Sequence, residues 1–284
     1  MRLPLPALIA ILPLMPLPAA AGVPQVVTDI PPVAALVAQV MGDLGKPAML
    51  LDRGGDEHDM QLRPSQLGAL SAADLVIWVG PELTPGLGSA LAATQVPMLA
   101  LLDDPATARM DYASGGVNPH AWLDPDVATA WTGLIVHRLA ELDPEHAAAY
   151  AANGAAASDR LAALKGELAA QLAPVADRPW LGWHDAYGYF ARAFDLTYLG
   201  GLSEGDEAPP GAARLAEVKA LAAAGGIACA FPEAQHDPGL IAALGPVRLG
   251  EPLDPVGSMQ DAGPDAYDAT LRALAASLRA CLSP

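Results

Sequence analysis

Three histidines stand at comparable places in the sequence, each after an apolar run typical of a buried strand. His58 lies in the loop from Gly54 to Asp59, and His120 and His184 follow apolar runs further along the chain. In open α/β sheets, ligands bind at the carboxyl ends of the strands. A lone histidine in a loop is more often solvated than functional, so the argument rests on the three placements together. If the two halves of the chain face each other, the three imidazoles converge on the cleft between them.

Three neutral imidazoles make a borderline-soft donor set that suits zinc better than magnesium or calcium. A tetrahedral zinc site needs one more donor, and the carboxylates of Glu57 and Asp254 are the nearby candidates. His236 also follows a predicted strand, and its role is ambiguous. His137 and His146 fall in predicted helices, where we expect them to be solvated. The histidines therefore predict a zinc site whose fourth ligand is left open.

The elements that would position these histidines alternate between strands and helices. In the first half, apolar runs predict strands at 26–28, 48–51, 75–79 and 98–101, with helices that begin at 31, 63 and 87. In the second half, they predict strands at 180–183, 196–199, 227–231 and 247–249, with helices at 215–224, 238–244 and 267–281. This alternation is typical of parallel sheets covered by helices on both faces. Residues 103–118 are polar, and we expect them to form a loop.

Two further helices are predicted in the middle of the chain. Asp124 is a suitable N-cap and Pro125 a suitable first residue for a helix that runs to about Leu142. The stretch 144–172 is rich in alanine, and its leucines form one apolar stripe. A single helix of that length would span about 42 Å, enough to cross from one lobe to another as a stiff connector. The alternative is a pair of helices broken at Gly154.

The composition indicates an exported protein that does not bind nucleic acid. The chain has 284 residues, of which 52% are hydrophobic, and a net charge of −17. An acidic surface repels nucleic acid and anionic membranes. Residues 1–21 combine Arg2, an apolar run and small residues before Gly22, which predicts a signal peptide cleaved near Ala21. We expect a periplasmic protein without a membrane anchor, because the run is short and rich in proline.

Cys229 and Cys281 are the two cysteines of the sequence. In an exported protein, two cysteines most simply form a disulfide, and a paired-thiol metal site is the alternative. Closing a loop of about fifty residues would contribute roughly 4 kcal/mol to stability by restricting the unfolded chain.

Five ordered motifs give the chain a resemblance to a known family. They are Gly55-x-Glu57-His58-Asp59 with Leu62-Arg63-Pro64-Ser65, Ala73-Asp74-Leu75 with Trp78-Val79-Gly80-Pro81-Glu82, Pro119-His120-x-Trp122-Leu123, His184-Asp185-Ala186-Tyr187-Gly188-Tyr189-Phe190 and Leu253-Asp254-Pro255-x-Gly257. Together they resemble the zinc-uptake solute-binding proteins of bacterial ABC importers. The resemblance covers nearly the whole chain after the predicted signal peptide.

The resemblance implies an α/β fold of two (β/α) lobes with parallel sheets, joined by one long helix, with the metal in the cleft. We expect the lobes at 22–143 and 174–284 and the connecting helix at 144–173. His58, His120 and His184 match the zinc ligands of the family position by position. Glu57 matches a glutamate that can reach the metal. Asp254 matches an aspartate that is a ligand in other branches, so it is the alternative fourth ligand or a residue that supports the site.

The resemblance also implies a role in zinc transport, and it helps to choose between zinc, manganese and hydrolase functions. We expect a monomer that captures zinc in the periplasm and delivers it to a membrane permease with a cytoplasmic ATPase. Manganese carriers of the same superfamily have a carboxylate where His184 stands, which favours zinc. The Cys229–Cys281 pair matches a disulfide of the zinc proteins. A zinc hydrolase is the rival class, with Glu57 or Asp254 as the base, but the chain has no HExxH pattern.

One feature departs from the family. Many zinc members have a long loop rich in histidine and acidic residues before the motif that carries His120. Residues 103–118 of this chain contain no histidine. An adhesive role, seen in some manganese relatives, is disfavoured because no lipid-attachment cysteine follows the predicted cleavage site.

Overall fold

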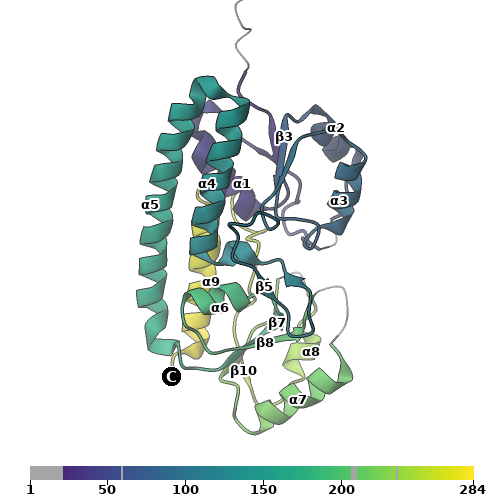
Figure 1. Cartoon of the computed structure of the whole chain (residues 1–284). Coiled ribbons are helices and arrows are strands. Elements are labelled where there is room, and N and C mark those ends of the chain that lie inside the picture. The colour runs from purple at the N-terminus through teal and green to yellow at the C-terminus, as the bar shows by residue number, and fades with distance from the viewer. Residues whose placement is uncertain (1–21, 59, 206–209, 235) are drawn as a thin grey trace, which may run out of the picture.

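The computed structural model describes residues 22–58, 60–205, 210–234 and 236–284. The predicted signal peptide therefore lies outside the described residues. Two α/β lobes stand one above the other, and one long helix runs along the same side of both (Figure 1). None of the helices in the described part of the chain is both long enough and apolar enough to cross a membrane.

The first lobe is built on a parallel sheet with the strand order β2-β1-β3-β4. Its elements are β1 (Val26–Thr28), α1 (Pro31–Met41), β2 (Ala48–Met49), α2 (Pro64–Ala72), β3 (Leu75–Trp78), α3 (Pro85–Ala92) and β4 (Met98–Ala100). Every residue of β1 and β3 is buried, because helices cover both faces of the sheet. The predicted parallel sheet is confirmed, and His58 lies in the connection between β2 and α2.

The second lobe repeats this topology. Its elements are β7 (Trp180–His184), α6 (Gly188–Ala193), β8 (Tyr198–Ser203), α7 (Ala212–Ala223), β9 (Cys229–Ala230), α8 (Gly239–Ala242) and β10 (Arg248–Leu249). The parallel order is β10-β9-β7-β8. In both lobes the first strand lies between the second and the third, so the strand order reverses beside the first strand, and ligands bind at such points. His184 is the last residue of β7, the first strand of this sheet.

The connection predicted to be a loop contains a small hairpin. Its strands are β5 (Met110–Asp111) and β6 (Val117–Asn118), which pair antiparallel. Strands of two residues leave too little periodicity to be predicted from the sequence. The hairpin is anchored to the second lobe, because the Tyr189 hydroxyl accepts from the Met110 N–H at 2.7 Å. It leads directly to His120 and then, after a short turn, to α4 (Pro125–Leu142).

Helix α5 (Ala147–Leu172) is one unbroken helix, preceded by the 3-10 turn Pro144–His146 and followed by the 3-10 turn Ala173–Val175. The predicted long helix is confirmed, and the alternative of a break at Gly154 is wrong. Gly154 packs against α4, where a Cβ would collide with a methyl carbon of Val136. The glycine therefore permits the close approach of two helices.

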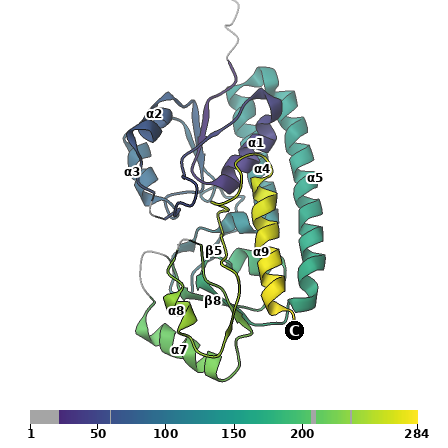
Figure 2. The same cartoon turned by 180° about the vertical axis from the view of Figure 1, so that it is seen from behind.

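Helix α9 (Ala266–Leu282) is the last element in sequence, yet it runs beside α5 and reaches α1 of the first lobe (Figure 2). Arg160 of α5 forms ion pairs with Asp265 and Asp268 at the start of α9, at 2.7 and 2.8 Å. One continuous apolar core extends from β1 to α9 and includes the buried stripe of α5. This helical layer fastens the two lobes to each other, which favours a fixed separation of their loops.

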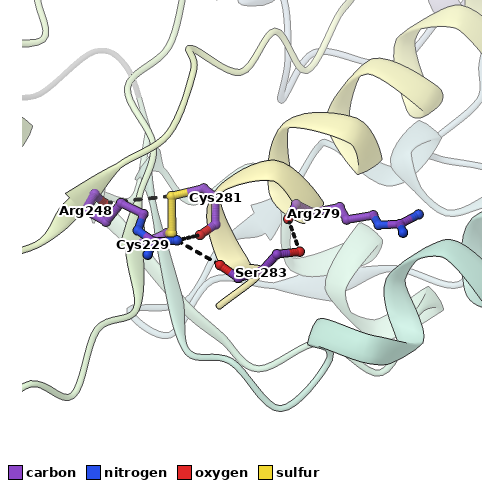
Figure 3. Close-up of a disulfide and its surroundings, with 5 residues drawn as sticks. All are labelled: Cys229, Arg248, Arg279, Cys281 and Ser283. Atoms are coloured by element: carbon purple, nitrogen blue, oxygen red, sulfur yellow. Dashed lines mark hydrogen bonds between the residues drawn. A yellow bond between two sulfur atoms is a disulfide. The ribbon is translucent and has the colours of Figure 1, made fainter.

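Cys229 of β9 and Cys281 of α9 form a disulfide, as predicted (Figure 3). The alternative of a paired-thiol metal site is wrong. Beside the disulfide, Nη1 of Arg248 donates to the carbonyl oxygens of Cys281 and Ser283 at 2.7 and 2.8 Å. These bonds satisfy acceptors at the C-terminal end of α9 that no further helical turn can reach. The end of the last helix is thus joined to the second sheet.

Replacing Cys229 with serine is expected to lower the thermal midpoint by roughly 5–10 °C, because closure of a loop of this length contributes about 4 kcal/mol. Metal binding by the three histidines should be retained, since neither cysteine lies in the cluster that they form. Paired thermal melts and metal stoichiometries of the wild type and the variant would test this. A folded variant without bound metal would instead place the thiols in the site.

Candidate metal centre

Glu57, His58, His120 and His184 come together, each with a ligand atom within 4.8 Å of the others. Glu57 is 3% exposed, His120 is fully buried and His184 is 1% exposed, whereas His58 is partly exposed. Two of these residues come from the β2–α2 connection, one follows the hairpin and one ends β7. The structure therefore gathers the three predicted histidines and one of the two predicted carboxylates in one place.

The loop that carries Glu57 and His58 is shaped by local hydrogen bonds and braced from the second half of the chain. Gly54 adopts a φ of 71°, which side chains other than glycine rarely take. Oδ1 of Asp56 accepts from the His58 N–H at 2.8 Å. The Gly54 N–H donates to the carbonyl oxygen of Ser258 at 3.2 Å. The position of this loop therefore depends on a segment about 200 residues away in the sequence.

Asn118 fixes the ring of His120. Its Oδ1 accepts from the His120 N–H at 3.0 Å and lies 2.9 Å from the ring Nδ1. Its Nδ2 donates to the carbonyl oxygen of Asp185 at 2.8 Å, which ties the pair to the second lobe. Because an amide oxygen can only accept, Nδ1 of His120 carries the proton, and Nε2 presents its lone pair.

Glu233 fixes the ring of His184 in the same way. Its Oε2 lies 2.6 Å from Nδ1 of His184, and its Oε1 accepts from the Tyr187 hydroxyl at 2.9 Å. His184 ends β7 and Glu233 follows β9, the neighbouring strand, so the pair sits where the strand order reverses. Sequence reasoning missed Glu233 and Asn118. Glu233 follows a predicted strand as the histidines do, so the same argument was available for it.

The Nε2 atoms of the three imidazoles converge on one point. Nε2 of His120 lies 3.3 Å from that of His58 and 3.0 Å from that of His184. The acceptors beside Nδ1 of His120 and His184 favour a proton on that nitrogen in each ring, which leaves the Nε2 lone pairs directed toward each other. A cation placed between these lone pairs would replace their mutual repulsion with attraction to the ion. Nitrogen ligands bound tetrahedrally at 2.0–2.1 Å from zinc lie about 3.3 Å apart, close to the separations here.

Burial lowers the pKa of His120 well below its usual value near 6.5, and the adjacent rings of His184 and His58 lower this pKa further. The His120 ring is therefore neutral at neutral pH, as a metal ligand must be. Burial and the Glu233 carboxylate raise the pKa of Tyr187 well above its usual value, so its hydroxyl remains a donor to Glu233.

Asp254 lies in a different position from Glu57. Its Oδ1 accepts from the Ser258 N–H and its Oδ2 from the Met259 N–H, each at 3.1 Å. Within the described residues, Asp254 is not a member of the cluster of possible ligands that contains Glu57. Its carboxylate instead holds the turn whose Ser258 carbonyl accepts from the loop of Glu57 and His58.

The other three histidines lie outside this four-residue cluster. His137 is exposed on α4 and pairs with a glutamate one helical turn away at 3.2 Å, in keeping with a solvated helix histidine. His146, also predicted to be solvated, is instead partly buried, with Nδ1 2.7 Å from the buried carboxylate of Asp143. His236 stands at the edge of the site, with Nε2 3.6 Å from Oε2 of Glu233.

Comparison with known proteins gives consistent matches over most of the chain. A family model described as zinc-uptake complex component A, periplasmic (ZnuA), matches residues 26–281. The high-affinity zinc uptake system protein ZnuA of Paracoccus denitrificans is 45% identical over 306 aligned positions, which cover 94% of each chain. The protein of the same description from Brucella suis is 30% identical, with 91% of each chain covered. The structure of the periplasmic zinc binding protein TroA from Treponema pallidum is similar with a TM-score of 0.83 at 22% identity, and covers 93% of this chain and 100% of that one.

Proposed function

The chain belongs to the family of periplasmic zinc-uptake component A proteins, and we propose that it binds one zinc ion between its lobes and delivers it to an ABC importer. Proteins of this family are carriers that serve an uptake system, so the chain is a solute-binding protein and the hydrolase alternative is set aside. The manganese alternative is set aside for the same reason, in agreement with an imidazole at His184.

The convergence of the three Nε2 atoms is the observation that supports this proposal most strongly. Two of these lone pairs are oriented by acceptors on the far side of their rings, Asn118 for His120 and Glu233 for His184. Partners of this kind fix the tautomer and the direction of a zinc-binding imidazole. The ligands are thus held ready for the ion, so little rearrangement is needed when zinc binds.

We propose His58, His120, His184 and Glu57 as the zinc ligands. Glu57 lies within ligand distance of the imidazoles and is nearly inaccessible to water. Its negative charge would offset part of the charge of the ion, and its position on a loop with two glycines favours release. Asp254 supports the site through the turn that braces this loop, rather than by binding the metal.

Replacing Glu233 with alanine is expected to weaken zinc binding by about 10–100-fold, as is typical when the partner of a ligand is removed. The reason is that His184 loses the acceptor of its Nδ1 proton and can turn or change tautomer. Glu233→Gln keeps an acceptor oxygen at the same side-chain length, so its loss should be smaller. Titration against a competing chelator would compare the two variants. An alanine variant that binds as tightly as the wild type would show that Glu233 does not position His184.

The proposal includes the surroundings in which the protein acts. A carrier of this family supplies zinc to an ABC transporter, and we propose a permease with a cytoplasmic ATPase as the partner. We further propose export to the periplasm with cleavage near Ala21, and action as a monomer.

The lobes are assigned to 22–143 and 174–284, with 144–173 as the connecting helix. In this division, α9 belongs to the second lobe and extends along the first.

Elemental analysis of protein purified from the periplasm without added metal tests the proposed function. The expected result is one zinc per chain. Stoichiometric manganese or iron without zinc would contradict the assigned specificity. A His137→Ala protein prepared in parallel serves as the control, because it removes an exposed imidazole that lies outside the cluster.

A further inference from the structure

A fourth imidazole lies behind the ring of His184, on the side that faces away from the other two ligands. The centroids of the His184 and His236 rings are 6.3 Å apart. Between them stands the Glu233 carboxylate, 2.6 Å from Nδ1 of His184 and 3.6 Å from Nε2 of His236. Ligand atoms of these three residues all lie within 4.8 Å of one another, which is close enough to hold a metal ion.

The His236 side chain is held in place and is closer to solvent than Glu233 and His184. Its ring stacks on the indole of Trp183, with centroids 5.5 Å apart and the planes inclined by 17°. Its side chain is 16% exposed, whereas that of Glu233 is 1% exposed. An imidazole and a carboxylate are both good ligands for zinc, and two ligands give a weaker site than four. A cation from solvent can therefore reach His236 more readily than the buried rings of His120 and His184.

We propose that His236 and Glu233 form a second, outer cation position, at which a divalent ion binds weakly on its way to or from the three histidines. This inference rests on the proposed function, because it concerns the same cargo. Zinc would be held there by Nε2 of His236 and a Glu233 oxygen, with water completing its coordination. The inner ligands lie at the other nitrogen of the His184 ring, whose Nε2 is 3.0 Å from that of His120. Binding at the outer position forms only bonds between zinc and its ligands and needs no further reactant.

The proposal makes two measurable claims. The wild type should take up one tightly bound zinc and then a second, weaker equivalent. The outer position should also speed the capture of the first ion, because it raises the local zinc concentration beside the site. Loss of the outer position should therefore slow the association of the first zinc ion.

His236→Phe is the variant for this test, because phenylalanine keeps a flat ring against Trp183 and removes the nitrogen ligand. The matched control is His137→Phe, which removes an exposed imidazole that also pairs with a glutamate, on α4. Zinc alone is the probe, titrated against chelators of graded affinity, and association is followed by stopped-flow tryptophan fluorescence. We expect His236→Phe to lose the weaker equivalent and to bind the first zinc ion more slowly. The control should do neither.

Two results would overturn the outer position. The first is a His236→Phe protein that keeps the second equivalent and the wild-type association rate. The second is a loss of the tightly bound zinc as complete as that expected for His120→Ala, which would make His236 an inner ligand. Absence of tight zinc from the wild type itself would be a failure of the proposed function instead, so the two failures are distinguishable.

Discussion

Replacing His120 with alanine is expected to abolish tight zinc binding. His120 is fully buried and central, since its Nε2 faces those of both His58 and His184. The change removes a proposed ligand, so the loss of affinity should exceed the roughly 10–100-fold typical for the partner of a ligand. Zinc in excess should also stop raising the thermal midpoint. For the wild type, zinc at about 1,000 times its dissociation constant stabilises the folded state by about 4 kcal/mol.

His137→Ala is the control for this measurement, because it removes a histidine from the surface of α4 and leaves the cluster intact. Circular dichroism of both variants without zinc checks that each is folded, since His120→Ala leaves a space beside Trp122. A folded His120→Ala protein that binds zinc as tightly as the control would contradict the proposed ligand set.

Lowering the pH from about 8 to about 5 is expected to weaken zinc binding steeply, because protons compete with the metal for the imidazoles. An imidazole of ordinary pKa begins to compete near pH 6.5. The pKa of His120 is lowered by burial and by the two neighbouring rings, so this ligand is protonated only at lower pH. The affinity should therefore continue to fall well below pH 6.5. An affinity that stays constant over this range would exclude a site dominated by histidine.

The pH dependence of zinc affinity tests the site more directly than the pH dependence of stability. In the metal-free protein, two buried groups change the stability in opposite directions as the pH falls. The lowered pKa of His120 means that only the unfolded chain takes up this proton just below pH 6.5, so this contribution to stability is lost as the pH falls. Burial raises the pKa of Asp29 from 3.8 to about 7. Between these values the folded state binds the proton and the unfolded chain does not, so this contribution to stability grows as the pH falls.

Much of the fold could be predicted because its signals are local. The buried strands read as apolar runs, Asp124 and Pro125 marked the start of α4, and the leucine stripe marked α5. Gly154 suggested a break, since glycine disfavours helix, but tertiary packing against Val136 decides that position. The path of α9 along α5 and α1 was not predicted, because a helix's apolar stripe does not identify its partner.

The candidate site was predictable to the extent that its proposed ligands share a placement at strand ends. His58, His120 and His184 were found in this way, and Glu57 was found through its neighbours in a motif. Glu233 and Asn118 were missed because the type and position of a residue do not reveal a hydrogen bond to an imidazole, although Asn118 is two residues from His120 and Glu233 follows a strand as the histidines do. His146 was assigned to solvent because its bond to a buried aspartate forms only at the corner between α4 and α5.

The most direct test of zinc capture by these residues is a crystal structure of the zinc-loaded protein with anomalous data at the zinc edge. We expect one strong peak about 2.0–2.1 Å from Nε2 of His58, His120 and His184, and a Glu57 oxygen about 2.0–2.2 Å away. An Asp254 oxygen at that distance, with Glu57 turned away, would reverse the assignment of the fourth ligand alone. A strong peak that none of the three imidazoles contacts would contradict the proposed site as a whole.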